Sequence, residues 1–273
     1  MHTILGVGFL HLNRTLPSNQ SHRLAEGYHW QRGIQLFRKA ILSKFGLHNM
    51  DALLSTCMLM GAQYLCPEAH KLTDCWVLSA EPTAMNWLYL QGGMRCLLDL
   101  ARPYIHRSIW AAISKETDHE ISLFDDPCQN QEELHSGLAD LCQVNDTTTP
   151  ENNPCYIPLK MLSSMLKLDP CYSNIPKFLD FTLSLQSSYL HLLQKKDPCA
   201  LVIIAHWMGL MCLTSQWQPW VDCRIRTECV AICIYLESST DRRILKLLEY
   251  PSRACGYPLR CISEDSPLLG DKF

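Results

Sequence analysis

Apolar residues recur at every third or fourth position along most of the chain, and this spacing predicts amphipathic helices. Between Arg23 and Phe45 the apolar stripe consists of Trp30, Ile34, Phe37, Ile41 and Phe45. Asn49 is a good N-cap residue for a second helix over residues 50–65. Further helices are predicted over residues 83–101, 131–142, 158–168, 175–194 and 222–237, and in the segment RRILKLLEY. The Gly92–Gly93 pair predicts a kink or a close helix crossing within residues 83–101.

The segment Cys199–Leu213 is different, because none of its residues is charged and only His206 is clearly polar. A helix needs about 20 apolar residues to span a bilayer, so this segment is too short, and we expect no membrane span. Asp197 and Pro198 precede it as an N-cap followed by proline at the first helical position. Since the helix is apolar on every side, it is predicted to be a central buried helix.

Strand-like alternation is lacking, so the predicted fold class is all-α. We expect a single helical bundle over residues 1–257, interrupted by a polar excursion at about 115–158. The run VNDTTTPENNP within this excursion is typical of a loop. The chain should become irregular from Ser252, with residues 258–273 as a tail.

Composition agrees with a globular domain, because 47% of the 273 residues are hydrophobic and 19% are charged. The formal net charge of −3 gives no general attraction to nucleic acid or acidic membranes. Fifteen cysteines, an odd number, do not suit a small disulfide scaffold. Many of them stand where a hydrophobic residue would fit, so we infer free, buried thiols in a reducing compartment.

Sequence signatures of catalysis are lacking, including the nucleophile elbow, the phosphate loop and the zinc-protease helix. The run Asp118–Glu120 places a histidine between carboxylates, but it is better interpreted as a solvated charge cluster in a polar loop. Metal ligands at close spacing are also lacking. Cys57, Cys66 and Cys75 are nine residues apart with His70 between the last two, and no C-x-x-C pair occurs. Cys229 and Cys233 are one helical turn apart in an apolar setting, which favours core packing. We therefore expect no catalytic residues, metal or cofactor.

His206 allows two interpretations. It could be a polar anchor that donates a hydrogen bond to a ligand hydroxyl inside an apolar site. It could instead be a core histidine bonded to a neighbour, which is the commoner case. The remaining candidate lining residues face the same choice between ligand site and core; they are Trp207, Met208, Met211, Trp217 and Trp220.

Taken together, several segments resemble the C-terminal regulatory domain of fungal zinc-cluster transcription factors, of the sterol uptake control protein type. One pair is YHWQRGIQLFRKAI followed by NMDALLSTCMLMGAQYL, and another segment is NWLYLQGGMRCLL. The most specific is DPCALVIIAHWMGLMCL, with Trp217 and Trp220 after it and LLEYPSRACGY beyond. The likeness extends from about Thr3 to Tyr257.

The resemblance implies a helical regulatory domain that binds a sterol or another hydrophobic metabolite and controls metabolic gene expression. It implies a ligand site lined by His206 and the tryptophans and methionines named above. It also implies a homodimer or pairing with other transcription regulators, in the nucleus or the cytoplasm. The six-cysteine zinc module of the family is not found in this sequence, so we expect no direct DNA binding by this chain. Two alternatives remain, namely a truncated or degenerate relic of such a factor and a helical enzyme with an apolar pocket.

Overall fold

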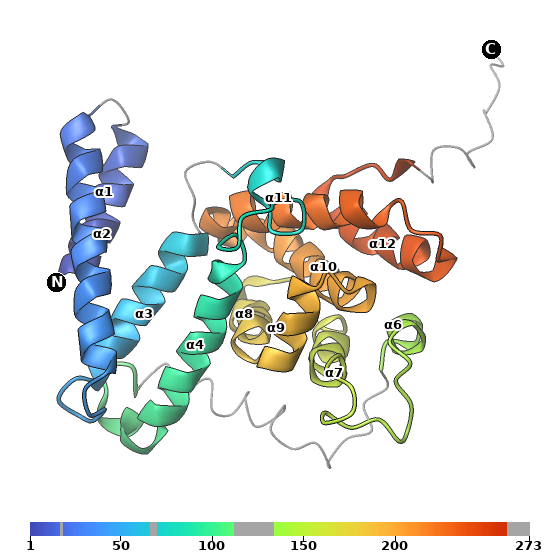
Figure 1. Ribbon diagram of the computed structural model, residues 1–273, viewed down its shortest axis with the longest axis horizontal. Coiled ribbons are helices and arrows are strands. Elements are labelled where there is room, and N and C mark those ends of the chain that lie inside the picture. The colour runs from blue at the N-terminus through green and yellow to red at the C-terminus, as the bar shows by residue number, and fades with distance from the viewer. Residues whose placement is uncertain (17–18, 66–69, 112–133, 261–273) are drawn as a thin grey trace. The chain divides into compact units, whose positions relative to one another are not determined.

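The computed structural model describes residues 1–16, 19–65, 70–111 and 134–260 (Figure 1). Within these ranges every regular element is helical, so the predicted all-α class is confirmed. The α-helices are α1 (His2–Thr15), α2 (Gln20–Ile41), α3 (Met50–Leu65), α4 (Asn86–Ala101), α6 (Ser136–Leu141), α7 (Tyr156–Met165), α8 (Ile175–Leu183), α9 (Ser187–Gln194), α10 (Pro198–Leu213), α11 (Pro219–Leu236) and α12 (Arg242–Cys255). The 3-10 helices are η1 (Leu72–Asp74), η2 (Arg102–Arg107), η3 (Tyr172–Asn174) and η4 (Ser215–Trp217).

The chain divides into two compact units, whereas the sequence pattern led us to expect one bundle. Unit 1 comprises Met1–Glu68 and Tyr89–Asp126, and unit 2 comprises Ala69–Leu88 and Pro127–Phe273. The division falls between Leu88 and Tyr89, inside α4, which the sequence pattern predicts as one helix over residues 83–101. Periodicity reveals the apolar face of each helix but not the helix that covers it, so it did not reveal this division.

In unit 1, α1 packs along α2, and α3 contacts both. Two glycines allow the close approach, since a Cβ at Gly6 would lie 2.9 Å from the Trp30 ring and one at Gly33 would lie 3.0 Å from Thr3 Cγ2. Trp30 is accordingly buried. The predicted stripe is wrong at its end, because α2 stops at Ile41, which is 47% exposed.

Asn49 does not have the capping role that the sequence suggested. Its Oδ1 accepts a hydrogen bond from the Gly46 N–H at 3.0 Å, and its amide donates to the Lys44 carbonyl at 3.2 Å. The side chain therefore stabilises the turn between α2 and α3.

In unit 2, α10 contacts α11 and α12 most extensively and also packs against α6, α7, α8 and α9. The predicted cap is present, since Asp197 Oδ1 accepts the Ala200 N–H at 3.0 Å. All residues from Ala200 to Cys212 are buried. Among the described helices none is by itself long and apolar enough to cross a membrane. Only α9 and α10 taken together, with a bend of 103° between them, have the length and composition of a membrane-crossing segment.

Two predicted boundaries in unit 2 are corrected. The single helix expected over residues 175–194 is two helices, α8 and α9, separated at Ser184–Gln186. The start of the segment expected to be irregular from Ser252 is still helical, because α12 continues through Pro251 to Cys255 and is capped by Gly256, whose φ is +79°. Pro251 is buried against α10, where it lies close to Gly209, so packing outweighs its usual helix-breaking effect.

Part of the predicted polar excursion is described. Residues 134–155 contain α6 and a series of turns. In these turns Asn145 Oδ1 accepts the Thr147 N–H at 2.9 Å, and Asn152 Oδ1 accepts the Thr149 N–H at 2.8 Å. The Asp118–Glu120 cluster and residues 261–273 of the predicted tail lie outside the described residues.

Candidate functional site

His206 lies in the middle of α10 and is buried. Its Nδ1 lies 2.8 Å from the Val202 carbonyl oxygen, which can only accept, so Nδ1 carries the proton. The ring also stacks on Tyr250 of α12 with the centroids 5.4 Å apart. Burial lowers the pKa of His206 to about 4, so the ring is neutral at pH 7. These contacts are those of a core histidine, and the Nδ1–H is not available to a ligand hydroxyl.

Trp207 is the best-anchored of the predicted ligand-site residues. Its Nε1–H donates to the Phe178 carbonyl of α8 at 2.7 Å. Its ring stacks on Phe181 with centroids 5.5 Å apart and an interplanar angle of 16°. The indole thus joins α10 to α8 through both a hydrogen bond and a ring contact.

Of the other four predicted residues, the structure shows the burial of three. Met208 and Met211 are buried in α10. Trp217, at the end of η4, is 38% exposed. Trp220 lies in the first turn of α11 rather than in a separate corner, and its side chain lies outside the described part. The structure therefore places His206, Trp207, Met208 and Met211 in one buried helix, whereas Trp217 lies partly exposed in η4.

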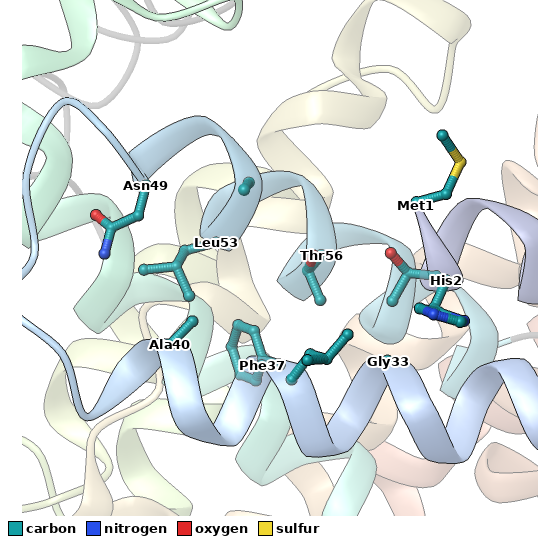
Figure 2. A pocket seen from close by; sticks show the side chains of 11 residues that line it. Met1, His2, Gly33, Phe37, Ala40, Asn49, Leu53 and Thr56 are labelled. Atoms are coloured by element: carbon teal, nitrogen blue, oxygen red, sulfur yellow. The ribbon is translucent and has the colours of Figure 1, made fainter.

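A cavity of about 150 Å³ lies in unit 1 between the start of α1, α2 and α3 (Figure 2). Phe37 of α2 and Leu53 and Thr56 of α3 point into this space. Typical ligand pockets have volumes of about 300–1,000 Å³, and a cavity of about 150 Å³ admits a molecule of benzene size. The cavity is thus too small for a sterol.

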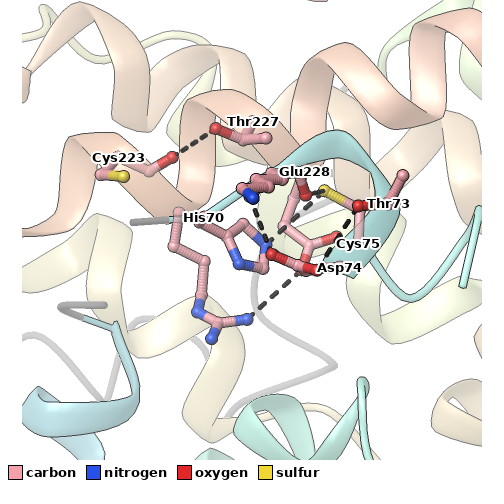
Figure 3. A network of polar contacts seen from close by, with 9 residues as sticks. His70, Thr73, Asp74, Cys75, Cys223, Thr227 and Glu228 are labelled. Atoms are coloured by element: carbon pink, nitrogen blue, oxygen red, sulfur yellow. Dashed lines mark hydrogen bonds and ion pairs between the residues drawn. The ribbon is translucent and has the colours of Figure 1, made fainter. Parts of the chain in front are cut away.

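A buried polar cluster in unit 2 joins the segment around η1 to α11 (Figure 3). The turn is fixed locally, because the Asp74 carboxylate accepts the Lys71 N–H at 3.0 Å. This turn brings Cys75 Sγ to 3.5 Å from His70 Nε2. Glu228 of α11 places Oε1 3.2 Å from the same nitrogen. Cys75 and Glu228 therefore both approach the same ring nitrogen of His70, and all three side chains are possible metal ligands.

Charge in this cluster is only partly balanced. Arg224, one turn before Glu228 on α11, places Nη1 3.4 Å from Glu228 Oε1. The Glu228 side chain is fully buried, and its other oxygen, Oε2, has no hydrogen-bond partner in the described structure. Burial and the neighbouring Glu228 raise the pKa of the Cys75 thiol well above its ordinary value. Cys75 is therefore a neutral thiol at pH 7.

The geometry of the cluster does not match that of a cysteine-protease-like triad. In such a triad one imidazole nitrogen faces the nucleophile and the other faces the carboxylate. Here Cys75 and Glu228 both face His70 Nε2, and the raised thiol pKa opposes a nucleophilic thiolate. The arrangement instead resembles a set of ligands around a single point.

A second cluster of possible ligands consists of Cys229 and Cys233 on α11 and Cys255 on α12. All three are buried. Cys229 Sγ lies 3.7 Å from the carbonyls of Ala205 and Pro251, and Cys255 Sγ lies 3.5 Å from the Ser252 carbonyl. Cys229 and Cys255 thus have backbone acceptors, which agrees with the core packing that the sequence favoured for this apolar setting. The cysteines that the structure describes are all free.

Sequence reasoning considered His70 and Cys75 and set them aside, and it did not consider Glu228. A signal for Glu228 was present, because it occupies the apolar stripe of α11 together with Val221, Ile225 and Ile232, which are also buried. A carboxylate on such a stripe needs a buried partner. The sequence does not identify that partner, since His70 lies 158 positions away.

By its fold the chain is an all-α protein with two helical units. Comparison with protein-family models, with curated protein sequences and with solved structures finds no match.

Proposed function

We propose that this chain is a helical regulatory protein of the transcription-regulator type, controlled by a sterol or another apolar metabolite and without catalytic activity of its own. In this role it pairs with itself or with other transcription regulators, in the nucleus or the cytoplasm. The proposal follows from the resemblance of its helical segments to the regulatory domains of fungal zinc-cluster factors. The all-α fold is the one that such a domain requires.

The ligand-binding part of this proposal rests on one observation, namely that buried methionines are frequent in α10 and in α7, which packs on it. Met208 and Met211 of α10 are buried, and α7, which packs on α10, contributes the buried Met161 and Met165. Methionine is unbranched and flexible, so a methionine-rich interface can rearrange around a guest more readily than one of branched residues. In this proposal a sterol would enter by displacing buried methionine side chains of α7 and α10.

The absence of catalysis is supported by the polar clusters in the described ranges. The His70 cluster lacks the geometry of a nucleophile and its base, and the three-cysteine cluster is packed as core. His206 is likewise neutral at pH 7 and hydrogen-bonded within its own helix.

Binding of the fluorescent sterol dehydroergosterol to the purified chain tests this function. Met208→Ile keeps the side-chain volume but removes its flexibility, and should weaken binding about tenfold. Met60→Ile in α3 of unit 1 is the matched control and should leave binding unchanged. If wild-type protein does not bind the sterol, or if Met208→Ile and Met60→Ile both bind like wild type, the proposed ligand site is wrong.

A further inference from the structure

We propose that His70, Cys75 and Glu228 form a zinc-binding site that fastens the segment around η1 to α11. This site is independent of the proposed apolar ligand. Its ligand atoms are His70 Nε2, Cys75 Sγ and a carboxylate oxygen of Glu228, which all lie within 4.8 Å of one another.

The separations of these atoms fit three positions of a tetrahedral zinc ion, whose fourth position a water would fill. Zinc binds sulfur at about 2.3 Å and nitrogen or oxygen at about 2.0–2.1 Å, so tetrahedral angles place sulfur and nitrogen about 3.5 Å apart, and nitrogen and oxygen about 3.3 Å apart. The measured separations are 3.5 Å from Cys75 Sγ to His70 Nε2 and 3.2 Å from His70 Nε2 to Glu228 Oε1. Because Cys75 and Glu228 approach the same ring nitrogen, the three ligand atoms can converge on one ion.

A second observation points to a bound cation. Glu228 is fully buried, and its Oε1 faces His70 and Arg224, yet its other oxygen, Oε2, lacks a hydrogen-bond partner in the described structure. Buried carboxylate oxygens are almost always paired, so an unpaired one calls for an ion or a water. By contrast, Cys229 and Cys255 of the other cluster have backbone acceptors within hydrogen-bonding reach.

The ligand set also indicates the identity of the metal. A thiolate, an imidazole and one carboxylate suit zinc, whereas magnesium and calcium prefer oxygen ligands only. Binding would remove the proton from the Cys75 thiol, because the thiolate is the ligand form. The guanidinium of Arg224, 3.4 Å from Glu228 Oε1, would repel the ion and weaken its binding.

Cobalt(II) titration of the whole chain, purified without metal and under reducing conditions, tests the site. We expect one tetrahedral cobalt ion per chain with a thiolate-to-cobalt charge-transfer absorption, displaced by zinc. Cys75→Ser should abolish that absorption. The matched controls are Cys223→Ser on the exposed face of α11 and Cys255→Ser in the three-cysteine cluster, and both should retain it.

Two further variants distinguish a metal site from a plain buried ion pair. Glu228→Gln should weaken zinc binding at least tenfold, whereas Arg224→Gln should strengthen it by removing the repelling charge. Circular dichroism shows whether each variant folds, and X-ray absorption of the zinc-loaded wild type gives the ligands without any substitution. One sulfur neighbour supports the site. Three sulfur neighbours, no bound zinc, or cobalt absorption retained in folded Cys75→Ser would overturn it.

Discussion

Trp207 provides the sharpest test of whether α10 is packed as a core helix or lines an open ligand site. In the structure its indole is 1% exposed, donates to the Phe178 carbonyl at 2.7 Å and stacks on Phe181. Trp207→Phe keeps an aromatic ring but removes the N–H donor and part of the ring volume. The change should therefore affect stability strongly if the packing is as described.

The expected cost is the sum of two contributions. The lost hydrogen bond contributes about 1 kcal/mol. The space left by the smaller ring contributes about 1–2 kcal/mol, as for other partial truncations of buried side chains. We therefore expect Trp207→Phe to lower the free energy of unfolding of unit 2 by roughly 2–3 kcal/mol. Trp207→Ala should cost about 3–5 kcal/mol.

Urea denaturation followed by far-UV circular dichroism measures this cost. The transition should be checked with a second probe, because a chain with two units need not unfold in one step. The matched control is Trp217→Phe, since Trp217 is 38% exposed, and it should change stability by less than about 0.5 kcal/mol. If Trp207→Phe costs no more than this control, the indole is not packed and bonded as described.

Two further predictions concern the contacts of α10. Because burial lowers the pKa of His206 from 6.5 to about 4, the unfolded chain takes up a proton first, so this residue should remove about 3 kcal/mol of stability as the pH falls from 6.5 to 4. His206→Phe keeps a ring to stack on Tyr250 and should flatten stability against pH in that window, and an unchanged slope would contradict the assignment. Gly209→Ala should destabilise by about 1–2 kcal/mol, since the new Cβ would lie 3.1 Å from Pro251 Cα. Gly93→Ala in α4, where a new Cβ would meet nothing within 4 Å, should instead stabilise the protein by about 0.5–1 kcal/mol. If thermal unfolding shows that Gly209→Ala and Gly93→Ala change stability in the same direction, the described packing at Gly209 is wrong.

The behaviour of the two glycines shows where sequence patterns stop being informative. The sequence marked Gly92–Gly93 as a kink or a close crossing, but the space around Gly93 is open. It gave no such signal at Gly209, where α12 approaches α10 closely. Both residues are glycines within helices, and only the position of the neighbouring helix makes one of them necessary.

The all-α class, most helix positions and the Asp197 cap of α10 could be read from the sequence alone. These features depend on interactions within a few residues, namely the 3.6-residue periodicity, a capping side chain and a proline at the first helical position. The apolar character of α10 likewise predicted its burial, because a helix without a polar face has to be covered on all sides.

The tertiary structure alone decided the division into two units, the continuation of α12 through Pro251, and the meeting of His70, Cys75 and Glu228. Each depends on contacts between segments far apart in the chain, and residue spacing contains no information on which faces meet. Glu228 is an example, because its position on an apolar stripe predicts that it has a buried partner but does not identify that partner. Only the packing of the segment around η1 on α11 supplied one, 158 positions away.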